Sequence, residues 1–226
     1  MPQLDEDIIA SAALTVLDAR GIDGFTMRAV AKVLGVTPMA LYHHVSDKES
    51  LVALVIDAAI REEPLPPTTG IWQDDLFAMA DWVRRAARAH PAIARLRRTY
   101  DVWTPAALQM TERSLALWKQ SGLDTERAVV AATTSSMAIV GLVSEEQSFR
   151  RIKPPEAGLV TSLPNARLLF TSRHNTDDEF ELIVRAIIDG LYTRLSAAAE
   201  VPAIESPKPR QAASARSTKV ENASER

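Results

Sequence analysis

The sequence predicts an all-α protein, in which an N-terminal unit of three helices with a helix-turn-helix is followed by a larger helical domain. Three observations support this prediction. Apolar residues recur at helical spacing through most of the chain, and residues that favour helix ends stand at the borders of these stretches. No segment alternates apolar and polar residues as a half-buried strand would.

The first predicted helix begins near Leu4 and carries a continuous apolar face. This face consists of Leu4, Ile8, Ile9, Ala12, Ala13, Val16 and Leu17. Their spacing of three and four residues places the side chains on one side of a helix. Gly21 and Gly24 follow and predict its end, because glycine is a poor helix former and a common C-terminal cap.

Two short helices are predicted next. Thr26 is a suitable N-cap for the first of them, which ends at Gly35. Thr37 can cap the second, with Pro38 in its first turn, where the missing N–H of proline costs nothing. The second is expected to run to about His44, so a sharp turn at Gly35 joins two helices of helix-turn-helix length.

Longer helices follow this unit. Ser46 or Asp47 caps a helix that ends before Pro64. Beyond a proline-rich loop, helices are predicted over about residues 71–89, 105–120, 125–148 and 177–198.

The chain divides into three parts. From Glu200 onwards Pro, Ser, Ala and mixed charges replace the apolar pattern, which predicts a disordered tail. We assign residues 1–50 to the helix-turn-helix domain, residues 51–199 to the larger helical domain and residues 200–226 to the tail.

Composition is that of a globular protein. Apolar residues make up 46% and charged residues 24% of the chain, which is enough for a buried core. The absence of cysteine excludes disulfides, thiolate metal sites and cysteine nucleophiles. The formal net charge of −3 shows no overall preference for nucleic acid, so any DNA contact must depend on local groups.

The N-terminal sequence resembles a known family. The resemblance rests on residues 21–26 (Gly-Ile-Asp-Gly-Phe-Thr), 28–31 (Arg-Ala-Val-Ala), 34–36 (Leu-Gly-Val), 41–45 (Leu-Tyr-His-His-Val) and 47–48 (Asp-Lys). Together these stretches resemble the tetracycline repressor family, over residues 8–56 without a gap. The resemblance implies a DNA-binding regulator of transcription. More specifically, it implies a repressor that a small-molecule inducer releases from a palindromic operator.

Four residues have the chemistry to hold the DNA backbone. Thr26 and Arg28 open the first short helix, where a hydroxyl, a guanidinium and free N–H groups can meet a phosphate. Tyr42 offers a phenol and Lys48 an ammonium group to the flanking phosphates. The alternative is that Tyr42 belongs to the core and that Lys48 is a solvated surface charge.

Base contacts would come from the exposed side of the second short helix. The candidates are Thr37, Pro38, Met39, Ala40 and His43. Thr37 can hydrogen-bond to base edges, whereas the next three residues offer mainly apolar contact, so we expect few direct hydrogen bonds to bases. One observation opposes DNA binding: residues 1–50 contain four Lys and Arg but seven Asp and Glu. These acids are tolerable only if they face away from the DNA.

The resemblance also implies a homodimer that pairs through its last helices. Independently, the last predicted helix has a wide apolar stripe, and the helix around residues 129–143 is rich in small residues that permit close approach. The alternative is that the stripe packs entirely inside its own subunit. The predicted interface residues are Val129, Ala132, Ser136, Val140, Phe180, Ile183, Val184, Ile187 and Leu191.

Large and adaptable side chains are concentrated in the central helices, where the family resemblance places a ligand site. Such sites are mostly apolar with a few polar anchors. The candidates are Trp103, Gln109, Met110, Trp118, Thr133 and Met137, and the alternative for each is ordinary core or surface. We expect a largely apolar inducer other than tetracycline, because the tetracycline site itself has no residue-level match in this chain.

Other functions find less support. No enzyme, cofactor or metal is expected, because catalysis would depend on four scattered histidines, and the adjacent His43 and His44 diverge by about 100° on a helix. The main alternative is an interaction or membrane-surface protein without specific DNA binding, suggested by six arginines within residues 84–98. The acidic residues 5–7 and the lack of an apolar run of bilayer length predict a cytoplasmic protein with no membrane partner.

Overall fold

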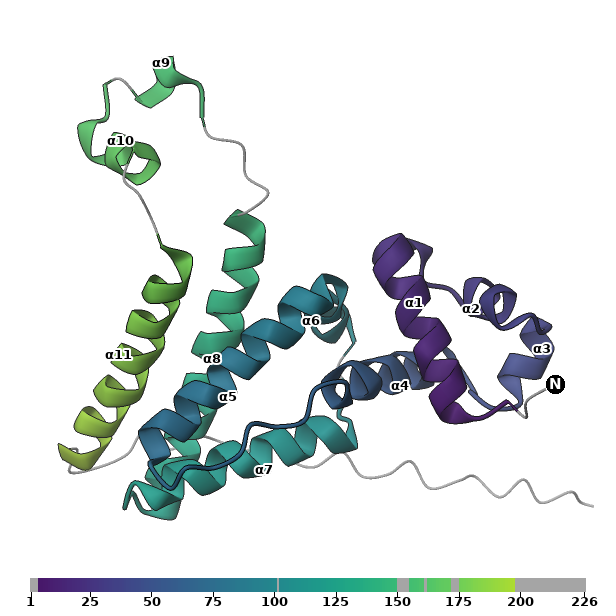
Figure 1. Cartoon of the computed structure of the whole chain (residues 1–226), viewed down its shortest axis with the longest axis horizontal. Helices are drawn as coiled ribbons and strands as arrows, with labels where there is room; N and C mark the ends of the chain where they lie inside the picture. Colours follow the sequence, from purple (N-terminus) through teal and green to yellow (C-terminus); the bar gives the residue numbers. More distant parts are fainter. Residues whose placement is uncertain (1–3, 101, 150–154, 161, 172–174, 198–226) are drawn as a thin grey trace, which may run out of the picture.

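The computed structural model describes residues 4–100, 102–149, 155–160, 162–171 and 175–197. Over these residues the chain is helical and has no strand, as the sequence predicts. The predicted tail, residues 200–226, lies outside the described residues. Figure 1 shows an elongated arrangement, with the N-terminal helices at one end and the last long helix at the other.

The N-terminal head consists of α1 (Glu6–Gly24), α2 (Met27–Leu34) and α3 (Pro38–Tyr42). The helical conformation of α1 breaks at Gly21, whose φ of 65° favours glycine. Gly35 ends α2 in the left-handed conformation, with a φ of 69°, and its N–H donates to the carbonyls of Ala31 and Lys32. Both glycines stand where the sequence predicts helix ends.

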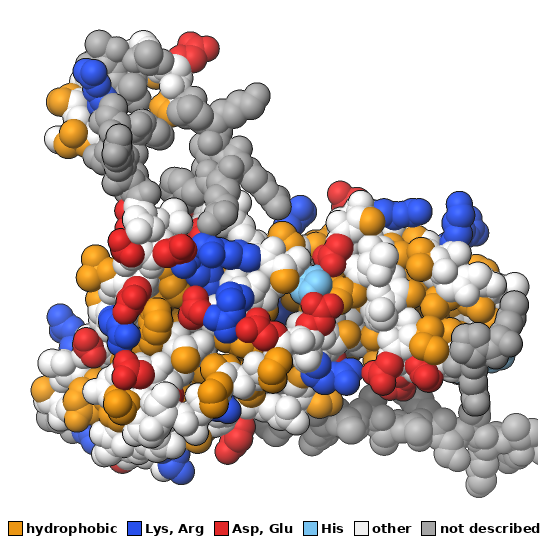
Figure 2. Space-filling model, viewed as in Figure 1, with side chains coloured by type: hydrophobic (Ala, Val, Ile, Leu, Met, Phe, Trp, Pro, Cys, Tyr) orange, Lys and Arg blue, Asp and Glu red, His pale blue; other side chains and the backbone are white. Residues whose placement is uncertain are grey.

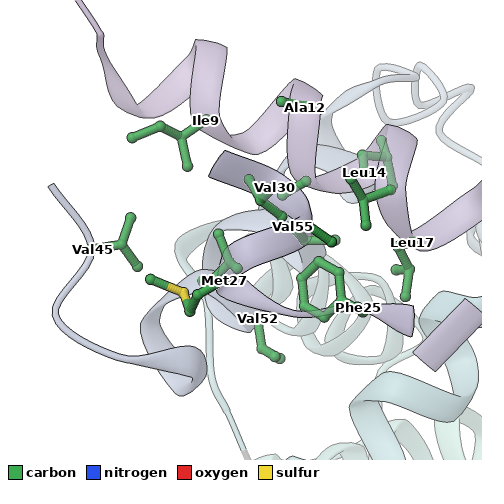
Figure 3. Packing of buried hydrophobic residues seen from close by; sticks show 14 of the residues in the cluster. Ile9, Ala12, Leu14, Leu17, Phe25, Met27, Val30, Val45, Val52 and Val55 are labelled. Atoms are coloured by element: carbon green, nitrogen blue, oxygen red, sulfur yellow. The ribbon is translucent and has the colours of Figure 1, made fainter. Parts of the chain in front are cut away.

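The next helix, α4 (Lys48–Arg61), carries the chain from the head into the rest of the molecule (Figure 1). Leu51, Val52 and Val55 of α4 are fully buried in a core that they share with α1 and α2. Figure 3 shows Phe25 among side chains of all three helices. Burial of such side chains stabilises by about 1.5–3 kcal/mol each, so α4 is held firmly to the head. The core of the head therefore continues beyond residue 50, through Ala59 at the end of α4, and also includes the fully buried Leu96.

The body is built from five longer helices: α5 (Trp72–Ala89), α6 (Pro91–Thr99), α7 (Pro105–Gln120), α8 (Thr125–Phe149) and α11 (Thr176–Ala197). A second core joins α5, α7, α8 and α11. Trp118 is fully buried in this core, and its indole N–H donates to Ser135 Oγ at 3.1 Å. The ring centroids of Trp118 and Trp72 are 5.6 Å apart. This core holds together α5, α7, α8 and α11, whose residues also line a cavity.

A buried ion pair fastens α5 to α8 and α11. The buried guanidinium of Arg84 contacts both oxygens of Glu146, at 2.7 and 3.0 Å, and Asp177 at 2.9 Å. Arg88 lies 2.6 Å from the same Glu146. Figure 2 shows basic side chains beside acidic ones over this part of the surface. The pairing favours a structural explanation of this part of the arginine-rich segment over a membrane-binding one.

By length and composition alone, α8 could cross a membrane. Its packing gives another reason for this composition, because Ala128, Ala131 and Val143 of α8 lie in the second core. Two short helices that the sequence does not predict, α9 (Ala157–Val160) and α10 (Pro164–Thr171), connect α8 to α11. They project beyond the ends of these two helices (Figure 1).

Candidate nucleic-acid interface and internal cavity

Two threonine caps set the beginnings of the helices around the candidate DNA-reading surface. The Oγ1 of Thr26 accepts a hydrogen bond from the N–H of Ala29 at 3.1 Å at the start of α2. The Oγ1 of Thr37 accepts one from the N–H of Ala40 at 3.2 Å at the start of α3. In each case the O–H hydrogen stays available as a donor to a phosphate or a base.

The candidate reading helix, α3, is anchored on one side and exposed on the other. Leu41 and Val45 are buried in the core of the head. On the other side, Met39 is 68% and Tyr42 is 47% exposed. The remaining predicted base-reading residues are Thr37, Pro38 and His43, which are exposed, and Ala40, which is half-buried. The structure thus brings all five to one end of the head.

Positive charge flanks this surface. Arg28 is exposed and Lys48 is half-buried. Within the ranges that the structure describes, neither of them forms a salt bridge with an acid, so both charges remain available for phosphates. The ammonium of Lys48 lies 5.8 Å from the ring centroid of Tyr100, which positions it at the start of α4.

The acids that oppose DNA binding in the sequence are largely engaged elsewhere. Asp7 lies 3.6 Å from Arg61, and Asp18 lies 2.8 Å from a ring nitrogen of His90. Asp5 and Asp47 are the N-caps of α1 and α4. Hydrogen bonds from the backbone and the hydroxyl of Ser50 lower the pKa of Asp47 below its ordinary value, so this cap stays ionised at neutral pH. Four of the seven acids are therefore committed to caps or to partners.

Two family models match the chain. One, described as bacterial regulatory proteins of the tetR family, covers residues 9–55, and the other, described as the tetracyclin repressor-like C-terminal domain, covers residues 63–195. The chain belongs to the TetR family. It is therefore a DNA-binding transcriptional regulator and not an enzyme, and the family, the all-α fold and the function predicted from the sequence are confirmed.

Individual relatives agree with this assignment. This TetR-family chain is 34% identical over 163 residues to an HTH-type transcriptional regulator of Saccharopolyspora erythraea, an alignment that covers 72% of the chain and 68% of the relative. It is 30% identical over 204 residues to the class A tetracycline repressor from transposon 1721 of Escherichia coli, covering 86% and 93%. Apo ActR from Streptomyces coelicolor superposes with a TM-score of 0.71 and 29% identity, covering 87% and 98%.

The outer face of α8 and α11 in this TetR-family chain carries exposed side chains that fit a dimer interface. Among the predicted interface residues, Val129, Ser136, Val140 and Ile183 are exposed. Leu182, which is not among the residues predicted from the sequence, is 70% exposed on the same helix as Ile183. The exposed apolar residues Val129, Leu182 and Ile183 give α8 and α11 a surface that a second copy could cover at the end opposite the head.

Other predicted interface residues face inwards. Ala132, Phe180 and Val184 are buried in the second core, and Ile187 and Leu191 are half-buried. The stripe on α11 has two sides, and its inner side packs on α5 and α8 of the same subunit. For these buried residues the alternative of packing within one subunit holds, because they retain almost no surface for a partner.

Two adjoining pockets, here called the two lobes of one cavity, lie among α5, α6, α7 and α8, and residues of α4 and α11 complete their walls. The lobes have volumes of about 120 and 190 Å³. They share four lining residues, which are Val83, Arg97, Met110 and Val140. The walls are otherwise mostly apolar, and this combination of apolar walls and few polar groups is typical of small-molecule sites.

The structure brings only one of the six predicted ligand residues to this cavity. Met110 lines both lobes, whereas Trp118 lines neither and is fully buried in the core. Trp103 is 63% exposed and lies outside the cavity, in the segment before α7. The other three candidates, Gln109, Thr133 and Met137, are exposed and line neither lobe. Aromatic content identified the region but not the wall residues.

Two polar contacts connect the head and α4 to the body. The buried imidazole of His90 has Nδ1 at 2.8 Å from Asp18 of α1 and Nε2 at 2.6 Å from Glu62, the residue that caps α4. Asp57 of α4 accepts a hydrogen bond at 2.9 Å from the N–H of Ala106, in the first turn of α7. Because α7 lines the cavity and α4 belongs to the core of the head, Asp57 links the two. The sequence pattern contains no signal for either contact.

The imidazole contact predicts a stability that depends on pH. Burial lowers the pKa of His90, but the hydrogen bonds that its ring donates to Glu62 and Asp18, together with the charges of these carboxylates, outweigh this effect, so the pKa of His90 is raised above its ordinary value. The charged imidazole of His90 therefore contributes its full share of the free energy of unfolding below the pKa of the unfolded state, about 6.5. This contribution is lost as the pH rises through the raised pKa of the folded state. We expect the stability difference between wild type and His90→Gln to shrink from pH 6 to pH 9.

Urea denaturation across this pH range checks the prediction. The matched control is His44→Gln, because His44 is exposed and its imidazole has no hydrogen bond or ion pair within the described residues. A His90→Gln difference that stays constant with pH would contradict the assignment of a charged imidazole between two carboxylates.

Proposed function

We propose that this chain is a homodimeric repressor that reads a palindromic operator through α3 and leaves it when a small molecule enters the two-lobed cavity. The observation that carries the DNA-binding part is the exposed side of α3, flanked by Arg28 and Lys48, which have no carboxylate partner in the described part of the chain. Phosphates would meet Thr26, Arg28, Tyr42 and Lys48. Base edges would meet Thr37, Pro38, Met39, Ala40 and His43.

Pairing of two copies through α8 and α11 would place two heads on one duplex. A twofold dimer presents its reading helices to half-sites about 34–36 Å apart, one turn of the double helix. The exposed apolar residues on the outer face of α8 and α11 support this pairing, and their position opposite the head leaves both reading helices free. Because such a regulator works on chromosomal DNA, we place it in the cytoplasm.

Release by a ligand is supported by relatives and by the path between cavity and head. ActR, which is 31% identical to this chain with a TM-score of 0.70, has been solved in complex with actinorhodin. In this chain a ligand that displaces α7 would move the N–H of Ala106 and, through Asp57, would pull on α4. A ligand shifts the equilibrium only as far as it binds the released conformation more tightly than the DNA-bound one.

A mobility shift across a salt series tests the proposed function. The protein is titrated onto DNA from immediately upstream of its own gene and onto a pool of sheared genomic fragments. We expect a discrete complex that survives excess non-specific DNA and weakens as salt rises, because phosphate contacts release counterions. If no fragment of the pool forms such a complex, the repressor proposal is wrong and an interaction protein becomes the better explanation.

The dimer gives a separate prediction. Leu182→Arg places a charge on the exposed outer face of α11, where a second copy would bury it. We expect sedimentation velocity to show the wild type at twice the chain mass of 24.7 kDa and the variant shifted towards the monomer, with weaker operator binding.

Gln120→Arg adds the same charge at the exposed C-terminal end of α7, a helix that carries none of the proposed interface residues, and serves as the control. The proposed interface is wrong if Leu182→Arg sediments like the wild type and like this control.

A further inference from the structure

The two-lobed cavity contains a polar atom without a partner. Ser144 of α8 is only 7% exposed and lines the larger lobe. Within the part of the chain that the structure describes, its Oγ forms no hydrogen bond, in contrast to Ser135 on the other lobe, whose Oγ accepts a hydrogen bond from the indole N–H of Trp118. Buried polar atoms in native proteins are almost always paired. The unpaired hydroxyl therefore marks a position where a bound molecule supplies the missing partner.

A single type of charge reaches the cavity. Arg97 of α6 lines both lobes, and no Asp or Glu lines either of them within the described residues. Arg97 is also exposed, so it lies where the cavity meets solvent. Arg84 and Arg88 of the neighbouring α5 are paired with Glu146, whereas Arg97 forms no salt bridge within the described part of the chain. Its guanidinium is free to receive an anion.

The size of the lobes indicates how a ligand would occupy them. Each lobe, at about 120 and 190 Å³, is smaller than the roughly 300 Å³ at which small-molecule pockets begin. Met110 lies on the boundary, because it lines both. Methionine is unbranched and has three rotatable side-chain bonds, so it can turn aside at low cost. A ligand that displaces Met110 would fill the two lobes as one site.

We propose that this site takes an elongated, largely apolar molecule that bears an anionic group. The apolar part fills the two lobes, the anion pairs with Arg97 at the opening, and a polar group of the ligand hydrogen-bonds to Ser144 in the larger lobe. A guanidinium binds a carboxylate, a phosphate or a similar oxyanion through two parallel hydrogen bonds. The inference rests on the proposed function only in taking this cavity as the effector site, and it adds the chemical class of the effector.

Two fluorescent probes test the class of ligand directly. Anilinonaphthalene sulfonate is apolar and anionic, whereas phenylnaphthylamine has nearly the same apolar body and no charge. We expect the wild type to bind the anionic probe more tightly. Arg97→Gln should lower the affinity for the anionic probe by roughly tenfold, which corresponds to the loss of one hydrogen bond to a charged group, and should leave the affinity for the neutral probe unchanged. Arg95→Gln is the matched control, because Arg95 is exposed on the same helix and lines neither lobe.

A second set of variants locates the probes. Met110→Trp fills the boundary between the lobes and should abolish binding of both probes. Val140→Trp, at a shared lining position that is itself exposed, serves the same purpose if Met110→Trp does not fold. The proposal is wrong if the anionic probe binds no better than the neutral one, if Arg97→Gln affects both probes equally, or if the folded filling variants bind both probes normally.

Operator binding is measured on the same proteins without probe. Arg97→Gln should retain it, because Arg97 is on α6 and not on α2, α3 or the start of α4, which carry the proposed DNA contacts. If the wild type binds no operator, the proposed function is wrong, whereas the result with the probes still stands. If the wild type binds its operator normally but the probe experiment is negative, only the proposed class of ligand is wrong.

Discussion

Trp118→Ala should lower the free energy of unfolding by about 3–5 kcal/mol, the range for removal of a fully buried tryptophan. The side chain is completely buried, its ring is tilted by 45° against that of Trp72 with the centroids 5.6 Å apart, and it donates a hydrogen bond to Ser135. The substitution would leave a cavity at the centre of the second core and would remove the hydrogen bond that Ser135 Oγ accepts, although this hydroxyl still donates to the carbonyl of Ala132 at 3.2 Å. Urea denaturation at a fixed protein concentration measures the loss.

Trp103→Ala is the matched control, because it removes the same side chain from a position that is 63% exposed. We expect its effect on stability to stay within about 0.5 kcal/mol. Trp118→Phe, which retains most of the volume, should fall between the two. Equal losses from Trp118→Ala and Trp103→Ala would contradict the placement of Trp118 in the core.

Combined substitution of Tyr42 and Lys48 by alanine should weaken operator binding by at least about a hundredfold. Each side chain is proposed to contact a phosphate, a hydrogen bond to a charged group contributes about 1.5–3 kcal/mol, and a dimer would lose each contact twice. The slope of log affinity against log salt should fall by about two, one for each lysine of the dimer. A mobility shift at several salt concentrations measures both quantities.

Two variants separate the causes. Lys119→Ala removes the same charge from the far end of α7 and should leave operator affinity and salt slope unchanged. Tyr42→Phe removes the hydroxyl alone, so it should lose less than Tyr42→Ala if the ring also contacts the DNA. Because Lys48 lies against Tyr100, circular dichroism must show that the double variant is folded. Unchanged affinity in a folded double variant would contradict the assigned surface.

The parts of the fold that the sequence predicts well are those decided by local chemistry. In the structure Gly35 ends α2, and Thr26, Thr37 and Asp47 are N-caps, at the positions that the sequence indicates. These features depend only on adjacent residues, because a glycine adopts a left-handed φ easily and a capping side chain accepts a hydrogen bond from a nearby N–H. The exposed side of α3 was predictable for the same reason. Once Leu41 and its neighbours identify the buried side, the opposite side follows from helical spacing.

The cavity could not be predicted in this way. Its walls come from helices that are distant in the sequence, and aromatic content does not distinguish Trp118, which fills the core, from Trp103, which is on the surface. Arg97 and Ser144 carry no local signal, since an arginine on an amphipathic helix and a serine in a small-residue helix are ordinary. The division of α11 into an inner and an outer side depends likewise on what packs against it, which is why Val184 turned out buried.

Footprinting of the wild-type protein on a genomic fragment that it retains tests the central claim most directly. The account predicts two protected half-sites of inverted sequence about 34–36 Å apart along the duplex, both of which disappear when Tyr42 and Lys48 are replaced by alanine. Protection without twofold symmetry, or protection that persists in the folded double variant, would contradict a dimer that reads DNA through α3.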